Sequence, residues 1–127
     1  MYNIYIKYKK GGKYIGTNYY IRQKGNTDFG IHVGKISCGW RFLMAGHIDD
    51  IHTDKNNSFV VAKFEDYVNL LNSHKDYYLE DEYGRECNIV DLVREIKIRA
   101  NHKKHNLNAD FAYSNPDYDV IFNTDFN

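Results

Sequence analysis

Two kinds of apolar spacing divide this chain, and most of its length has the spacing of β-strands. Apolar and polar residues alternate with a period of two in several short segments, which is the pattern of half-buried strands. These segments are 2–8, 14–21, 29–36, 40–44, 58–62, 77–79 and 118–126. Helical spacing occurs at 64–71 and 89–100. The sequence therefore predicts an α+β protein, with a mainly antiparallel sheet of about five to six strands and two helices packed on one face.

Glycine and asparagine mark the expected ends of these segments. Gly11 and Gly12 predict the turn of a first β-hairpin, and Gly25 predicts the turn after it. A glycine inside a strand pattern usually marks a bulge or a close approach of another backbone, so Gly30 and Gly34 predict such features. Asn88 is a good N-cap for the second helix. Residues 1–127 are expected to form a single domain, since this length supports one core.

Composition removes several classes of function. The chain has 17 Lys and Arg against 17 Asp and Glu, which is not the balance of a protein held to nucleic acid by its overall charge. Cys38 and Cys87 are too few for a disulfide framework and lack metal-ligand spacing. The first residues lack a signal-peptide core, and no later stretch approaches a membrane span, so we expect a cytosolic protein without a membrane partner.

The polar stretch 46–58 is expected to be an exposed loop that carries metal-ligand residue types. These are His47, Asp49, Asp50, His52 and Asp54. Spacing within a flexible loop is permissive, so the favoured interpretation is a polar loop without metal. No cofactor is expected. No local signature places a nucleophile beside a base, and we therefore expect a protein that is not an enzyme.

Residues 32–41 hold the densest group of side chains able to grip a ligand. Gly30, Gly34 and Lys35 suggest a phosphate-binding loop, but only three residues separate the glycines and Ile36 follows the lysine, so the match fails. Donor side chains and one stacking ring remain. They are His32, Lys35, Ser37 and Arg41 with Trp40. The alternative is a solvated hairpin face with Trp40 in the core.

Two motifs carry a resemblance to a known group of proteins. The pattern His-x-Gly-Lys-x-Ser-x-Gly-Trp at 32–40 and Asp-Glu-Tyr-Gly-Arg at 81–85 resemble small accessory proteins of tailed bacteriophages. The resemblance spans about residues 28–126, with Ile36 and Cys38 as departures from the usual first motif. It implies a viral protein that acts in the cytoplasm of a bacterial host, in counter-defence or host takeover.

Three hypotheses of function remain. In the first, the protein sequesters a small phosphorylated, nucleotide-like ligand in a preformed pocket, which could lie at a homo-oligomer interface. Its seven predicted ligand-binding residues are His32, Lys35, Ser37, Trp40, Arg41, Tyr83 and Arg85. In the second, an exposed aromatic patch inhibits a host defence protein. In the third, lysines, arginine and tyrosines of residues 5–24 bind nucleic acid. The identity of the ligand or partner is beyond the sequence.

Overall fold

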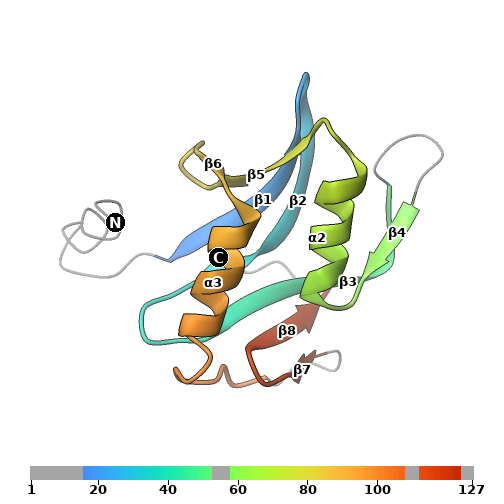
Figure 1. Cartoon of the computed structure of the whole chain (residues 1–127). Helices are drawn as coiled ribbons and strands as arrows, with labels where there is room; N and C mark the ends of the chain where they lie inside the picture. Colours follow the sequence, from blue (N-terminus) through green and yellow to red (C-terminus); the bar gives the residue numbers. More distant parts are fainter. Residues whose placement is uncertain (1–15, 53–57, 108–111, 124–127) are drawn as a thin grey trace.

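The computed structural model describes residues 16–52, 58–107 and 112–123, and its elements follow the expected order (Figure 1). The strands are β1 (Thr17–Gln23), β2 (Asn26–Ile36), β3 (Phe42–His52), β4 (Ser58–Val61), β5 (Tyr77–Asp81), β6 (Glu86–Cys87), β7 (Ala112–Ser114) and β8 (Tyr118–Phe122). The helices are α2 (Phe64–Ser73) and α3 (Ile89–Ile98). The strand predicted at 2–8 and the turn at Gly11-Gly12 lie outside the described residues.

The described strands form one eight-stranded sheet, so the α+β prediction is confirmed with a higher strand count than expected. The order across the sheet is β6-β5-β1-β2-β3-β8-β7, and β4 pairs with β3. All pairs are antiparallel except β3 with β8, which is parallel. A parallel neighbour needs a long crossover connection, and here α2, β5, β6 and α3 all lie between the two strands in the chain.

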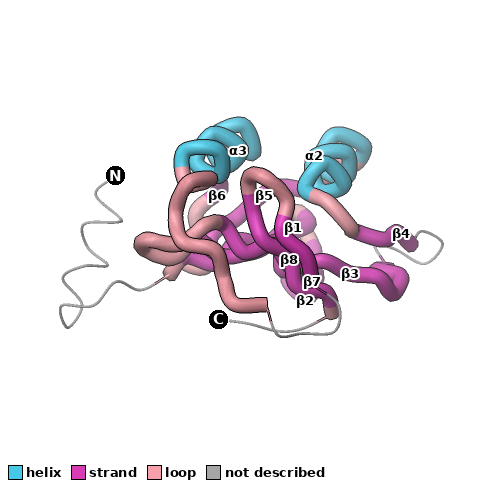
Figure 2. Tube along the Cα trace, turned by 90° about the horizontal axis from the view of Figure 1, so that it is seen from below, coloured by secondary structure: helices cyan, strands magenta, loops and turns pink. Residues whose placement is uncertain are grey.

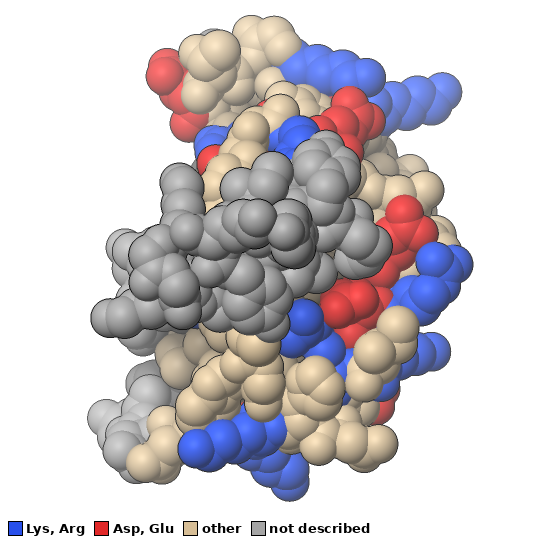
Figure 3. Space-filling model, turned by 90° about the vertical axis from the view of Figure 1, so that its left-hand side faces the viewer, with Lys and Arg blue, Asp and Glu red and all other residues tan. Residues whose placement is uncertain are grey.

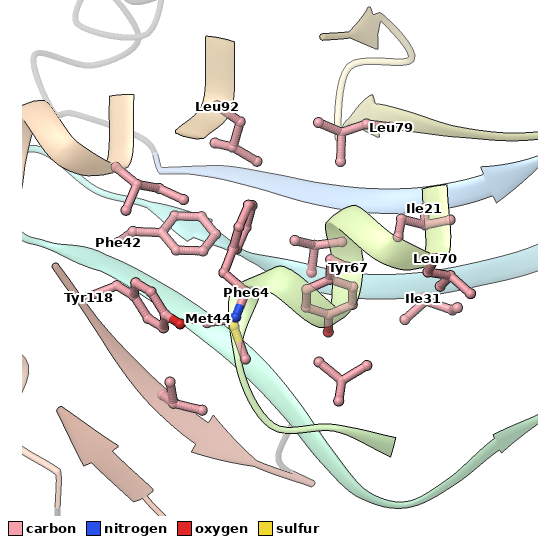
Figure 4. Packing of buried hydrophobic residues seen from close by; sticks show 14 of the residues in the cluster. Ile21, Ile31, Phe42, Met44, Phe64, Tyr67, Leu70, Leu79, Leu92 and Tyr118 are labelled. Atoms are coloured by element: carbon pink, nitrogen blue, oxygen red, sulfur yellow. Dashed lines mark hydrogen bonds between the residues drawn. The ribbon is translucent and has the colours of Figure 1, made fainter. Parts of the chain in front are cut away.

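Both described helices cover the same face of the sheet, as predicted (Figure 2). Alternation along each strand sends the apolar side chains of the sheet toward these helices. Ile21, Ile31, Phe42 and Met44 belong to this core. Figure 4 shows Phe42 and Met44 near Phe64 of α2, and Ile21 and Ile31 near Leu70 of the same helix. None of the helices in the described part of the chain is long and apolar enough to cross a membrane.

The N-terminal ends of the two helices are held by polar groups that the sequence supplies locally. In α3, Asn88 is the N-cap, and its side-chain oxygen accepts a hydrogen bond from Val90 N at 2.8 Å, as predicted. In α2, the Asp66 carboxylate accepts from the amides of Ala62 and Lys63. The Phe64 amide donates instead to the Tyr118 hydroxyl at 2.9 Å, which ties α2 directly to β8.

The sheet forks between β2 and β3. Each strand has 11 residues, but they pair only at Gly34 with Met44 and Lys35 with Leu43. Beyond that point β3 pairs with β4, and β2 continues with β1 alone among the described strands. The Tyr67 hydroxyl of α2 occupies the fork, 2.9 Å from His32 O and 2.5 Å from Ala45 O. A helix side chain thus supplies a hydrogen-bond donor to the strand carbonyls at the point where the two strands part.

The two glycines expected to interrupt β2 have different surroundings. A Cβ on Gly34 would lie 2.4 Å from Cζ of Phe42 and 2.5 Å from Leu43 O. A Cβ on Gly30 would lie 2.4 Å from Nη1 of Arg22. The pairing register between β1 and β2 also shifts at Tyr19/Tyr20, so β2 carries an extra residue between His32 and Gly34. The predicted close backbone approach is therefore found at Gly34, whereas Gly30 meets only a side chain and lies next to the second register shift, between Arg22 and Gln23.

The stretch 46–58 is not the loop that its polar sequence suggested. Strand β3 continues through His52, and β4 begins at Ser58, so much of this stretch belongs to a β-hairpin. Polarity misled the prediction because a strand at the end of a sheet can carry polar residues on both faces. Asp54 lies outside the described residues.

We predict that Tyr67→Phe destabilises the protein by about 1–3 kcal/mol, because the ring still fills the core while a carbonyl oxygen at the fork loses its donor. Urea unfolding followed by circular dichroism measures this change. Val68→Ala, at a half-buried site on the same helix, provides a comparison for ordinary loss of packing. An unchanged midpoint in Tyr67→Phe would show that the hydroxyl does not hold the fork.

The same hydroxyl predicts how stability depends on alkaline pH. Burial, and next the charge of Asp66, raise the pKa of Tyr67 well above its usual value of 10.0. The unfolded chain therefore releases this proton first, so the free energy of unfolding is unaffected below about pH 10 and falls as pH rises from there toward the folded pKa. Urea titrations from neutral pH to pH 11 should show a smaller loss in Tyr67→Phe than in wild type.

We predict that Gly34→Ala and Gly30→Ala differ sharply in stability. The first places a methyl group against a buried ring and a backbone carbonyl and should cost about 1–3 kcal/mol or more. The second meets only the far end of the flexible Arg22 side chain and should cost much less. Thermal unfolding of the two variants side by side checks this, and equal melting temperatures would contradict it.

Candidate functional site

A hollow of about 380 Å³ lies beside the fork, on the face of the sheet opposite α2 and α3. Alternation places Tyr20, Arg22 and His32 on this face, because Ile21 and Ile31 point into the core. The hollow is lined by Tyr20, Arg22, Asp28, Gly30, Ile31, His32 and His47. Its volume lies near the lower end of small-molecule pockets, which span about 300–1,000 Å³. We call this set of residues the fork hollow.

Two rings and a guanidinium form one wall of the fork hollow. The Tyr20 and His32 rings stack with centroids 5.2 Å apart and planes inclined by 29°. Cζ of Arg22 lies 4.8 Å from the Tyr20 ring centroid, so the tyrosine lies between an imidazole and a cation. The pairing of β1 with β2 places these groups side by side, since Tyr20 pairs with His32 and Arg22 with Gly30.

Arg22 keeps part of its hydrogen-bonding capacity for a ligand. Its Nε lies 3.2 Å from Oε1 of Glu80 on β5, and its side chain is 34% exposed. Nη1 and Nη2 make no hydrogen bond to the described residues. A guanidinium held through Nε presents its two Nη groups to an oxyanion, and this pair matches the two oxygens of a phosphate or carboxylate.

The two histidines of the fork hollow are already oriented by the protein. Asn18 Nδ2 donates to the Glu82 carboxylate at 3.2 Å, so Oδ1 of Asn18 faces His32 and accepts from its Nε2 at 2.9 Å. Nε2 of His47 donates to the backbone oxygen of His32 at 3.3 Å. Both rings therefore carry a proton on Nε2 and are fixed in place, which makes the hollow a preformed site.

The residues predicted to bind a ligand are not gathered into one site. Of the seven, His32 lines the fork hollow. Lys35 and Ser37 lie together farther along, since a Cβ on Gly16 would meet Cε of Lys35 at 3.2 Å and Oγ of Ser37 at 3.1 Å. Neither lines the hollow.

Trp40 neither lines the hollow nor belongs to the hydrophobic core in which the alternative interpretation placed it, because it is half-buried against the segment that follows α3. Its ring stacks on His105 with centroids 5.0 Å apart, and Nζ of Lys103 lies 4.6 Å from its centroid. The backbone of Trp40 also forms a bridge to Lys103. The indole thus docks the segment that follows α3.

Arg41 is part of the interior and corrects the prediction of a ligand donor. It is 1% exposed and forms an ion pair with the fully buried Asp119, with Nη1 and Oδ1 3.7 Å apart. Nη2 donates to Asn115 O. Asp119 also accepts from the His105 amide at 2.8 Å and from Ser114 Oγ at 2.7 Å. A guanidinium enclosed in this way cannot meet a ligand without unfolding its surroundings.

Tyr83 and Arg85 lie in the turn between β5 and β6. Cζ of Arg85 lies 5.4 Å from the Tyr83 ring centroid, and its Nε lies 3.2 Å from Oδ2 of Asp81. The Asp81 carboxylate also accepts from the amides of Tyr83 and Arg85, and Gly84 has φ +81°. These contacts order the turn around the Asp81 carboxylate, away from the hollow.

The residues that join His32 in the hollow were named for other reasons or not at all. Tyr20 and Arg22 belonged to the proposed nucleic-acid surface, and His47 to the candidate metal loop. The described residues contain no group of three or more His, Cys, Asp or Glu side chains that could hold a metal. No sequence pattern marked Asp28 as a site residue, because its position depends on the irregular pairing of β2 near the hairpin turn.

We predict that Arg41→Ala lowers the free energy of unfolding by about 3–5 kcal/mol, because it leaves the Asp119 carboxylate buried without its cation. Chemical unfolding measures this. The double variant Arg41→Met with Asp119→Leu removes both charges and should recover much of the loss. Equal destabilisation by Arg41→Ala and Arg94→Ala, whose side chain is 66% exposed, would contradict the prediction.

Comparison with protein-family models, with curated protein sequences and with solved structures gave no match.

Proposed function

We propose that this chain is a ligand-binding protein that sequesters a small phosphorylated, nucleotide-like molecule in the fork hollow. The observation that carries the proposal is Arg22, which is anchored through Nε and lines the hollow with two Nη groups that make no hydrogen bond to the described residues. A phosphate takes those groups, and the hollow has room for one ring system beside the stacked Tyr20 and His32. By the resemblance of its motifs, the protein acts in the cytoplasm of a bacterium infected by a phage.

The side chains that line the hollow favour binding of a ligand over its chemical conversion. The Nε2 protons of His32 and His47 are committed to Asn18 and to a backbone carbonyl. Covalent catalysis would need a nucleophile beside one of these rings or beside the Asp28 carboxylate, and the described residues that line the hollow include no Ser, Thr, Cys or Lys side chain. The arrangement instead offers fixed rings and a fixed cation, which suit recognition.

Inhibition of a host protein through an aromatic patch has less support. Among the described residues, the exposed tyrosines are Tyr83 and Tyr113, at 42% and 37%. They lie at opposite edges of the sheet, in the β5–β6 turn and on β7. Two separated rings do not make the contiguous anchor that such an interface needs.

Nucleic-acid binding rests mainly on residues outside the described ranges, including Lys7, Lys9, Lys10 and Lys13. Of the basic residues in that group, the structure describes Arg22 and Lys24, and Arg22 is paired with Glu80. Figure 3 shows Lys and Arg side chains next to Asp and Glu side chains on the described part of one face, with no broad field of one sign. A phosphate backbone favours such a field.

The proposal is tested by titrating nucleoside monophosphates into the purified protein by isothermal calorimetry, after native mass spectrometry for a co-purified ligand. Arg22→Ala should weaken binding about tenfold or more, because a charge-assisted hydrogen bond contributes about 1.5–3 kcal/mol. Arg94→Ala removes an arginine from α3, on the other face of the sheet, and should bind like wild type. Equal affinity of Arg22→Ala and wild type would refute the site, and absence of binding by all of these nucleotides would refute this function.

A further inference from the structure

The fork hollow combines a cation with a carboxylate, and this combination restricts the ligand further. Asp28 lines the hollow together with Arg22, so the formal charges of these two side chains cancel. Glu80, which pairs with Arg22, adds another negative charge next to the site. An anion without hydrogen-bond donors would be attracted by the Arg22 guanidinium and repelled by both carboxylates. A ligand that fits must present an anionic group to Arg22 and donors to Asp28.

The Asp28 carboxylate is available for such donors. Its backbone amide donates to Oδ1 of Asn26 at 3.2 Å, but its side chain makes no hydrogen bond or ion pair with the described residues. Asp28 is exposed, and it belongs to the irregular segment where the β1–β2 register shifts between Arg22 and Gln23. A carboxylate accepts only, so two adjacent N–H groups match its two oxygens.

Resting on the proposed function, we infer that the ligand is a guanine nucleotide, with its base read by Asp28 and its phosphate held by Arg22. The Watson–Crick edge of guanine presents a ring N–H and an exocyclic amino group side by side, which a carboxylate receives as a pair. The same edge of adenine presents one amino group beside a ring nitrogen that is an acceptor, and this nitrogen would face a carboxylate oxygen. Asp28 therefore selects guanine over adenine by attraction and by repulsion.

The test compares guanosine, inosine and adenosine monophosphates as probes by isothermal calorimetry. Wild type should bind the guanine nucleotide about tenfold or more tightly than the adenine nucleotide. Guanine offers a donor to each oxygen of Asp28, whereas adenine sets its ring nitrogen, an acceptor, against one of them. The inosine nucleotide keeps the ring N–H but lacks the amino group, and its affinity should lie between the two.

Asp28→Asn is the decisive variant. Its amide offers one acceptor and one donor, which match the adenine edge, so the preference for guanine should fall about tenfold or invert. Asp91→Asn removes a carboxylate that is 69% exposed on α3 and should keep the wild-type preference. Circular dichroism of Asp28→Asn should be unchanged, since its carboxylate has no partner to lose among the described residues.

The outcomes separate this inference from the function beneath it. A guanine preference that disappears in Asp28→Asn supports both. Equal binding of the three nucleotides, or a preference that survives in Asp28→Asn, overturns the reading of the base while the Arg22-dependent binding stands. Failure of all three nucleotides to bind folded wild-type protein overturns the inference and the proposed function together.

Discussion

A single phenolic hydroxyl sets the geometry on which the middle of this sheet depends. Strands β2 and β3 separate after two paired positions, and separation leaves backbone carbonyls without ladder partners. The Tyr67 hydroxyl lies within hydrogen-bond distance of two of them, on His32 and Ala45. Because Tyr67 belongs to α2, the position of that helix and the opening of the sheet are fixed by the same side chain. The fork hollow lies on the other face, between side chains of β1 and β2 and His47 of β3.

Local patterns in the sequence were sufficient for the elements whose contacts are local. The apolar stripe of α3, its N-cap at Asn88 and the left-handed Gly84 all depend on neighbours a few residues away. The parallel pairing of β8 with β3 depends on residues far apart in the chain, such as Phe42 with Tyr118, and alternation alone carries no information about partner or direction. The extension of β3 through His52 was missed for a related reason, since its pairing with β4 compensates for a polar sequence.

The candidate site was less predictable than the fold because sequence proximity misrepresents position on a strand. Arg41 and His32 are nine residues apart in one dense motif, but Arg41 is enclosed with Asp119 and His32 lies on the face opposite the helices. Arg22 and Asp28 come from a segment that composition marked as basic and turn-like. Only the register between β1 and β2 shows that these residues face the same hollow. The motif at 32–41 identified one residue of the site, His32. The other residues can be identified only from the pairing of strands across the sheet.

The position of β8 has a consequence for how the chain acquires its structure as it is made. Strand β3 leaves the ribosome long before β8, which must then align beside it in parallel over Phe42–Gly46. Until it does, one side of β3 lacks its ladder and the Arg41 guanidinium lacks its counter-ion, since Asp119 lies on β8. The nascent chain therefore carries an unfinished sheet edge during most of its synthesis. Completion of the fold is a late, long-range event in which one strand closes the edge and neutralises the buried cation at the same time.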